Sequence, residues 1–451
     1  MNPRDDTIAA LATPAGTAAL AVIRISGVDA KKLATELLGR PPLPRSASRT
    51  DYQSLSGELI DDVLLTFFPG PKSYTGDDVL ELSSHGNPFI ARKLLDDLYA
   101  RGCRPAGPGE FTERAFLNGK MDLSQAEAVM DLIQARSDRA LAAAHYQLRG
   151  ALGRKLQLLV DGLLAALARV EAYIDFPEED LPTEDSELVA TEIANVLRGT
   201  TRLLATEQAG TWLREGIATV ILGEPNAGKS SLLNQLVGRD RALVSPEPGT
   251  TRDFIEERLL VGGHWLRLVD TAGLNDTPGA VERLGIEKTI EQAESADLIL
   301  VVMDATRPSP IIPPALAARL SAENTLVVFN KMDLVKGRSV AIPPEHLTVI
   351  PVSALAGTGL ASLEAAIAGL ADRFQDTLGD EFVAINARHA LALTQVRTAL
   401  DDALANLAAR GPVELLASDL RSALDAVGQI SGKVDNERML DALFLTFCIG
   451  K

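Results

Sequence analysis

A glycine-rich turn between an apolar run and a helix-forming segment constrains the fold more than any other feature. Residues 216–233 are GIATVILGEPNAGKSSLL, in which Gly223 to Ser230 has the spacing G-x-x-x-x-G-K-S. Strand, glycine-rich loop and helix in this order are typical of a phosphate-binding loop, because backbone N–H groups and a helix N-terminus then converge on the phosphates. Lys229 is expected to reach the β- and γ-phosphates. These flanking elements favour such a loop over a glycine turn that binds nothing.

Length and composition limit the class of protein. A chain of 451 residues is too long for one core and indicates about three domains. No window offers the roughly 20 apolar residues of a membrane span, and the N-terminus lacks a signal-peptide pattern. Cys103 and Cys448 are too few for a disulfide framework, so we expect a cytoplasmic protein. The net charge of −17 argues against a chain that simply coats nucleic acid, so any RNA contact must be local, through a basic patch.

The first 119 residues have the pattern of a mixed α+β domain. Residues 19–25, 63–68 and 79–82 are expected to be strands, since apolar runs alternate with Gly, Pro and Asp. A helix is predicted over 89–99, entered through Asn-Pro.

A helical region follows. From 122 to 173 the chain is rich in Ala and Leu, with apolar residues recurring every three or four positions, which predicts two helices meeting near 150–153. Ser124 and Glu127 have the spacing of a capping box at the first of these helices. Another helix is predicted over 186–210.

From 216 to about 370 the pattern alternates strand and helix, as a parallel α/β sheet requires. Helical texture then returns over 387–409 and 414–429, which indicates one helical domain interrupted by an inserted α/β domain. The expected strands of the insert are 217–222, 255–260, 265–269, 298–303, 326–329 and 348–351. The predicted segments are an N-terminal domain (1–119), a first helical part (120–211), the insert (212–373) and a second helical part (374–451).

Four further signatures follow the phosphate-binding loop in order. GTTRD at 249–253 offers Thr hydroxyls to Mg²⁺ and the γ-phosphate, and DTAG at 270–273 ends an apolar strand, where it can face the same groups. NKMD at 330–333 ends another strand, and its Asp can accept from guanine N1–H and the 2-amino group, which adenine lacks. SAL at 353–355 closes the base pocket. The set predicts a Ras-like P-loop GTPase domain.

The residues expected to contact GTP follow from these signatures. They are Asn226, Ala227, Gly228, Lys229, Ser230, the adjacent Ser231, Thr250, Thr251, Asp270, Thr271, Ala272, Gly273, Asn330, Lys331, Asp333, Ser353, Ala354 and Leu355.

Three residues bear on how water is activated. Leu274 follows DTAG where many GTPases have a water-orienting Gln, so another group must orient the water. Glu282 is a candidate, although from the residues alone a solvated helix carboxylate is favoured. Asn226 offers an amide oxygen that suits a monovalent cation, and a simple turn residue after proline is the equal alternative.

With these motifs, the chain resembles the MnmE (TrmE) family of GTPases that modify tRNA wobble uridines. The resemblance runs from end to end and is specific, because other switch GTPases lack the N-terminal blocks and the terminal Cys-Ile-Gly-Lys. The resemblance rests on the motifs above, on Glu282 and on four further segments: AVIRISG at 21–27, DVLEL at 78–82, NGKMDL at 118–123 and FCIGK at 447–451.

The resemblance implies a homodimer joined through N-terminal domains that bind a tetrahydrofolate derivative, 5-formyl- or 5,10-methylene-tetrahydrofolate. It implies an FAD-dependent MnmG-like partner, with which the family adds a carboxymethylaminomethyl or aminomethyl group at C5 of the wobble uridine in certain tRNAs. GTPase domains of the family pair across the dimer in K⁺, and hydrolysis is needed for modification.

By position, the resemblance assigns further roles. Glu282 orients the attacking water, and Ser230 and Thr251 bind Mg²⁺. The implied K⁺ ligands are Asn226, Ser245, Glu247 and Thr250, and Ser245 is also an implied GTP contact. The implied folate contacts are Arg24, Glu81, Lys120 and Lys451. A cation set such as Arg24 with Lys120 suits the carboxylates of folate; without the family, surface charge is the default interpretation.

Two positions carry alternatives. Leu355 replaces the Lys or Arg often found in the base-pocket motif, which is expected to loosen base stacking. Cys448 does not belong to a prenylation box, because Gly450 is not aliphatic. It is either a buried structural thiol or a catalytic thiol that serves uridine or folate chemistry, and the resemblance favours function. The rival for the whole chain is an Era-like regulatory GTPase in ribosome or RNA assembly, without one-carbon chemistry.

Overall fold

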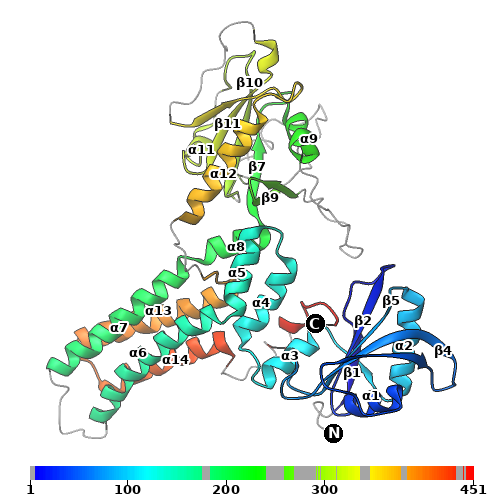
Figure 1. Cartoon of the computed structure of the whole chain (residues 1–451). Coiled ribbons are helices and arrows are strands. Elements are labelled where there is room, and N and C mark those ends of the chain that lie inside the picture. Colours follow the sequence, from blue (N-terminus) through cyan, green and yellow to red (C-terminus); the bar gives the residue numbers. More distant parts are fainter. Residues whose placement is uncertain are drawn as a thin grey trace. The chain divides into compact units, whose positions relative to one another are not determined.

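The computed structural model describes residues 6–174, 183–239, 258–268, 291–335 except 292, 295 and 311, 346–376, 383–432, 440 and 443–450. The chain forms two compact units (Figure 1). The first unit comprises Met1–Met130, Leu148–Ile193 and Thr398–Lys451, and the second comprises Asp131–Gln147 and Ala194–Arg397. The division into segments that end at residues 119, 211 and 373 stays a prediction.

The N-terminal part of the first unit is a six-stranded sheet in the order β3-β4-β5-β2-β1-β6. Its neighbours pair antiparallel, except that β1 and β6 run parallel. Helices α1 and α2 share one apolar core with the strands, and the predicted α+β class is confirmed. The elements are β1 (Ile8–Leu11), β2 (Leu20–Ser26), α1 (Ala30–Leu38), β3 (Ala47–Gln53), β4 (Leu59–Phe68), β5 (Val79–His85), α2 (Pro88–Ala100), β6 (Arg104–Pro105) and α3 (Glu110–Leu117).

Two long helices of the first unit, α6 (Ala151–Ile174) and α14 (Val413–Ser431), lie side by side (Figure 1). Their buried residues recur every three or four positions, as Leu152, Leu156, Leu159 and Leu163 do in α6. Such a stripe buries one face of each helix, so two segments that are distant in the sequence form one helical layer. Three further helices, α4 (Leu123–Gln134), α7 (Thr183–Leu204) and α13 (Ala387–Ala408), each have residues in both units.

The prediction of two helices over 122–173 is wrong, because this stretch forms three: α4, α5 (Asp138–Leu148) and α6. The additional break lies at 135–137, where the Ser137 hydroxyl accepts a hydrogen bond from Ala140 N at 3.1 Å. A serine that caps the next helix starts a new one without any Gly or Pro. The helix predicted over 186–210 likewise divides into α7 and α8 (Glu207–Glu215).

The predicted capping box at the start of α4 is also wrong. Asp122 Oδ1 accepts from Gln125 N at 2.8 Å, and Gln125 Oε1 accepts from Asp122 N at 2.9 Å. Ser124 donates to the Asp122 carboxylate at 2.7 Å instead of capping. The reciprocal pair therefore lies two residues earlier at both members, because a carboxylate is the stronger acceptor.

The second unit contains a six-stranded sheet in the order β12-β11-β10-β7-β9-β8. Its three central strands are buried along their whole length, and separate apolar clusters cover the two faces. This is the pattern of a parallel sheet enclosed by helices. The elements are β7 (Ile217–Leu222), α9 (Lys229–Arg239), β8 (Arg258–Val261), β9 (His264–Leu268), β10 (Leu298–Asp304), α11 (Pro314–Ala317), β11 (Thr325–Asn330), η2 (Met332–Leu334), β12 (Thr348–Pro351) and α12 (Leu360–Asp376).

The predicted parallel α/β sheet has one antiparallel edge, where β8 pairs with β9. Gly262 and Gly263 join these strands with φ of 58° and 86°. Two successive residues at positive φ form the tight turn of a hairpin, which returns the chain antiparallel. The remaining strands pair parallel, as predicted.

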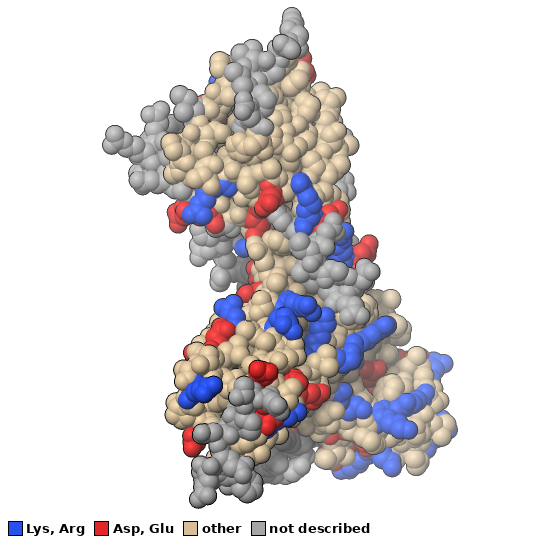
Figure 2. Space-filling view, turned by 90° about the vertical axis from the view of Figure 1, so that its left-hand side faces the viewer, with Lys and Arg blue, Asp and Glu red and all other residues tan. Residues whose placement is uncertain are grey.

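The surface carries charge of both signs. On the face shown in Figure 2, Lys and Arg side chains lie in local groups among Asp and Glu. Within the described residues, no helix has both the length and the apolar character needed to cross a membrane.

Candidate functional site

The phosphate-binding loop leads from β7 into α9, as predicted. Gly223 and Gly228 have φ of 153° and 95°. A Cβ at Gly223 would lie 2.2 Å from Val302 O, and one at Gly228 would lie 2.2 Å from Asn330 Nδ2. Both positions therefore require glycine, because backbone and a polar side chain approach too closely for any larger residue.

The Lys229 side chain makes hydrogen bonds within this loop. The Lys229 ammonium donates to the carbonyls of Gly223 and Glu224, at 3.0 Å each. Ser230 and Ser231 occupy the first turn of α9, where backbone N–H groups and the helix dipole favour an anion. Mg²⁺ is typically held by one or two protein oxygens together with substrate phosphates, which suits the Ser230 hydroxyl.

Asn330, at the end of β11, connects the predicted base-reading motif to the phosphate-binding loop. Its Nδ2 donates to Ala227 O at 2.9 Å, and its Oδ1 accepts from Ala354 N at 2.9 Å. The exposed Asp333 accepts from the Ser353 hydroxyl at 2.5 Å. Three of the predicted signatures thus meet in one hydrogen-bonded cluster at the predicted nucleotide pocket. The contact of Asp333 with a guanine base stays a prediction.

Lys331 lies in the same pocket in a left-handed conformation, with φ of 63°. Its ammonium donates to Asn226 O at 2.6 Å and forms an ion pair with Asp304 Oδ2 at 2.7 Å. Burial alone would raise the pKa of Asp304, but hydrogen bonds from Lys331 and Thr306 outweigh it and lower the pKa to about 2. Sequence reasoning missed Asp304, although a single acid that ends the otherwise apolar strand LILVVMD was a visible signal.

Leu355 is 85% exposed, whereas its neighbour Ala354 is buried. Its predicted effect on base stacking stays a prediction. The remaining nucleotide and cation residues lie outside the described part of the chain, so their roles stay predictions as well: Ser245, Glu247, Thr250, Thr251, Asp270, Thr271, Ala272, Gly273 and Glu282. Among described residues, no group of three or more His, Cys, Asp and Glu is arranged to hold a metal ion.

In the first unit, two of the implied folate contacts meet. Arg24 on β2 lies opposite Glu81 on β5, and its Nε and Nη2 donate to Glu81 Oε1 at 3.1 and 2.8 Å. The guanidinium also lies 5.1 Å from the ring centre of Tyr74 and 5.8 Å from that of Phe111. Lys120 is exposed and donates to Pro71 O at 2.9 Å, and Lys451 lies outside the described residues.

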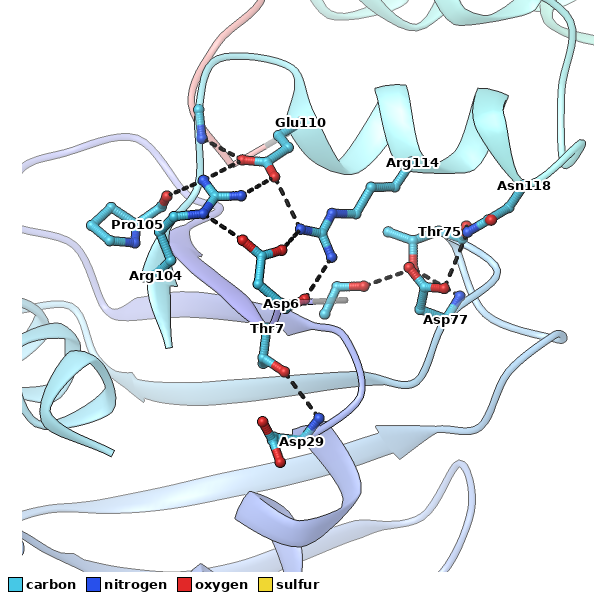
Figure 3. Close-up of polar contacts among 12 residues, drawn as sticks. Asp6, Thr7, Asp29, Thr75, Asp77, Arg104, Pro105, Glu110, Arg114 and Asn118 are labelled. Carbon is cyan, nitrogen blue, oxygen red and sulfur yellow. Dashed lines mark hydrogen bonds and ion pairs between the residues drawn. The ribbon is translucent and has the colours of Figure 1, made fainter. Parts of the chain in front are cut away.

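An ion-pair network holds α3, the helix that carries Phe111, against the sheet (Figure 3). Arg104 pairs with Asp6 and Glu110 at 2.6 Å each, and Arg114 pairs with Asp6 at 2.5 Å and Glu110 at 3.0 Å. Two acids and two guanidiniums thus neutralise one another at the junction of β1, β6 and α3. Burial alone would raise the pKa of Glu110, but hydrogen bonds from Arg104, Gly107 N and Arg114 hold it below its ordinary value.

The C-terminal segment docks on the same helix. Cys448 O accepts from Gly109 N at 3.2 Å at the start of α3, and Phe447 is buried. Gly450 has φ of 97°, and a Cβ there would lie 2.2 Å from Leu11 O. The Cys448 side chain is exposed, so the alternative of a buried structural thiol is wrong. By contrast, burial raises the pKa of the Cys103 thiol to about 12.

Comparison with known proteins covers nearly the whole chain. The family model for the GTP-binding protein TrmE N-terminus matches residues 7–120, and the model for the MnmE helical domain matches residues 123–448. Relatives named tRNA modification GTPase MnmE include that of Opitutus terrae, 58% identical over 452 residues and 100% of both chains. Those of Akkermansia muciniphila and Geobacillus kaustophilus are 44% and 42% identical, each over 458 residues and at least 99% of both chains. The chain therefore belongs to the MnmE (TrmE) family.

Proposed function

We propose that this chain hydrolyses GTP in the service of tRNA modification, the activity for which its full-length relatives are named. The observation that carries the proposal is the 58% identity over the whole length of such a relative. It covers both the pocket around Asn330 and the Arg24–Glu81 pair. A switch that lacked covalent chemistry would need only the first of these.

In the nucleotide pocket, each predicted residue has a chemical task. The loop amides and Lys229 bind the phosphates, Asp333 accepts from the guanine base, and Ser230 with Thr251 holds Mg²⁺. Asn226 is exposed at the turn of the loop, and its side-chain amide oxygen is a suitable ligand for K⁺, together with Ser245, Glu247 and Thr250. A bound cation there supplies the charge that an arginine finger supplies elsewhere. Glu282 orients the attacking water.

In the N-terminal site, we propose tetrahydrofolate binding at Arg24, Glu81, Lys120 and Lys451. The Arg24 guanidinium lies beside two aromatic rings and pairs with Glu81, which suits a flat heterocycle with N–H donors. Of the proposed folate contacts, Arg24 pairs with Glu81 and Lys451 lies outside the described residues, so the exposed Lys120 is proposed to bind a folate carboxylate. The exposed Cys448 serves the covalent step at the uridine or the folate. A homodimer, an FAD-dependent MnmG-like partner and a cytoplasmic location complete the proposal.

Turnover in different salts tests the cation proposal. We expect the purified chain to hydrolyse GTP at least about tenfold faster in KCl than in NaCl at equal ionic strength, as for the loss of a group that stabilises transition-state charge. Equal rates would remove K⁺ from the mechanism and leave the GTPase assignment intact.

Folate binding separates the proposal from an Era-like regulatory GTPase. At 100 times its dissociation constant, 5-formyl-tetrahydrofolate should stabilise the full chain by about 2.7 kcal/mol. A thermal-shift measurement with GDP as the positive control detects this change. A shift with GDP and none with folate would favour the regulatory switch.

A further inference from the structure

We propose that Asp304 is a positioning residue that fixes Lys331 and thereby sets the affinity of the pocket for guanine nucleotides. The proposal rests on GTP binding, which the family shares, and is independent of folate, K⁺ and the partner protein. Asp304 acts through Lys331, which lies two residues before the base-reading Asp333 in the chain.

The position of Asp304 is unusual for an acid. It ends β10, whose other residues are apolar and buried, and it lies opposite Asn330 in the register with β11. Its side chain is 7% exposed. Because a buried carboxylate is costly unless paired, a pairing role explains its presence here better than chance does.

The two oxygens of Asp304 have different partners. Oδ1 accepts from Thr306 N at 3.0 Å and from the Thr306 hydroxyl at 2.6 Å. This double contact fixes the plane of the carboxylate. Oδ2 is thereby directed at the Lys331 ammonium, 2.7 Å away. Arg307 Nε lies at 3.8 Å and adds a weaker, exposed charge.

Lys331 is consequently held at both sides of its ammonium, by Asp304 on β10 and by Asn226 O in the phosphate-binding loop. A lysine side chain otherwise loses much rotamer freedom when a ligand orders it. With the ammonium fixed before binding, that loss does not weaken nucleotide affinity. The ion pair therefore organises the base-reading loop and the phosphate-binding loop together.

Nucleotide affinity of the full chain tests the proposal, with a fluorescent GDP analogue as the probe. Asp304→Asn should weaken GDP binding by about tenfold, since a charge-assisted hydrogen bond is lost. The matched control is Asp297→Asn, just before the other end of the same strand. Asp297 accepts from Ala218 N and Gln208 Nε2, each at 3.0 Å, away from the pocket residues. The Asp297→Asn variant should bind GDP with the affinity of the parent chain.

A double-mutant cycle separates positioning from a merely structural role. In a Lys331→Met background, Asp304→Asn should have almost no further effect on GDP affinity, because its partner is gone. If the same tenfold loss appears in both backgrounds, or if Asp304→Asn binds GDP like the parent, the proposal is overturned.

A second variant covers the case in which Asp304→Asn does not fold. Thr306→Val keeps the charge but removes one of the two donors that orient Oδ1. It should weaken GDP binding by about threefold, and again only when Lys331 is present. Parent-like affinity in Thr306→Val, with a lowered melting temperature, would show that the turn serves stability alone and would contradict the proposal.

Discussion

Two ion pairs, one in each sheet, show different ways to build a site. Lys331–Asp304 lies where parallel strands end, and its contacts come from motifs that follow those strands. Arg24–Glu81 lies within two antiparallel strands and joins residues 57 positions apart. A parallel sheet gathers its chemistry at loops, whereas an antiparallel sheet can present it along an open face.

The pairs also leave opposite charges accessible. In the nucleotide pocket the acid is the more buried partner, with 7% exposure against 29% for Lys331. In the N-terminal site the base is more buried, with 17% exposure against 30% for Glu81. The first site therefore offers a cation to its ligand and the second offers a carboxylate. This sharpens the folate proposal, since Glu81 suits N–H donors of the ring while Lys120 remains for the glutamate tail.

The largest effect is expected from Gly228→Ala in the nucleotide pocket. The added methyl would lie 2.2 Å from Asn330 Nδ2, at a φ of 95°. Strain together with loss of the Asn330–Ala227 hydrogen bond should weaken GTP binding by roughly 100-fold or more, measured by calorimetry. Gly263→Ala is the control, because its φ is 86° but a Cβ there meets nothing within 4 Å. An equal loss of GTP affinity in both variants would mean that backbone strain, and not the contact with Asn330, causes the effect.

A smaller effect, on folate binding and not on GTP binding, is expected from Arg24→Met in the N-terminal site. It leaves Glu81 without its guanidinium partner, so folate binding should weaken by about tenfold while GTP binding stays unchanged. Arg49→Met removes an exposed ion pair with Asp62 from the same sheet and should change neither. Isothermal titration with each ligand checks the pattern, and a loss of GTP affinity in Arg24→Met would contradict the separation of the sites.

The next largest effect is expected from acid, which should weaken the ion-pair network that holds α3 against the sheet. Burial raises the pKa of Asp6 and of Glu110, but hydrogen bonds from Arg104 and Arg114 outweigh it, so each pKa lies below its ordinary value of 3.8 and 4.5. The unfolded chain then binds more protons, so this stabilisation is complete above about pH 5 and is lost as pH falls through the folded-state values.

Glu110→Gln should flatten that dependence and lower the first unfolding midpoint at pH 7 by about 2–4 °C. Calorimetric scans between pH 7 and pH 3 measure both effects. Asp62→Asn, at an exposed pair, serves as the control. An unchanged pH profile in Glu110→Gln would exclude the network as the acid-sensitive element.

The smallest change in stability is expected from Cys448→Ser. Because the side chain is exposed, the free energy of unfolding should stay within about 0.5 kcal/mol of the parent, while tRNA modification is lost. Cys103→Ser places a hydroxyl in the apolar core and should cost about 1–3 kcal/mol without a direct effect on chemistry. Full modification activity in Cys448→Ser would contradict a catalytic thiol.

The same contrast explains what the sequence could predict. Strands β7, β10, β11 and β12, and the motifs after them, are local patterns, and their positions follow from apolar runs and loop residues. The register that opposes Arg24 to Glu81 is set by strand pairing, which no short motif contains. Only the resemblance to a family brought these two residues together before the structure did.

The misses have physical reasons as well. Strand β3 (ASRTDYQ) buries only Tyr52, so it lacks the apolar alternation that identifies a strand. The break before α5 depends on the Ser137 cap and contains neither Gly nor Pro. Asp304 was missed because its role depends on the ion pair with Lys331, which lies 27 residues later in the chain.

The central claim is that one chain needs both sites for a single modification. Mass spectrometry of the wobble uridine, in tRNA from cells lacking this gene and complemented with variants, tests it most directly. The parent chain should restore the C5 modification, whereas Lys229→Ala and Arg24→Met should each fail to restore it at parental expression levels. Full restoration by either variant would contradict it.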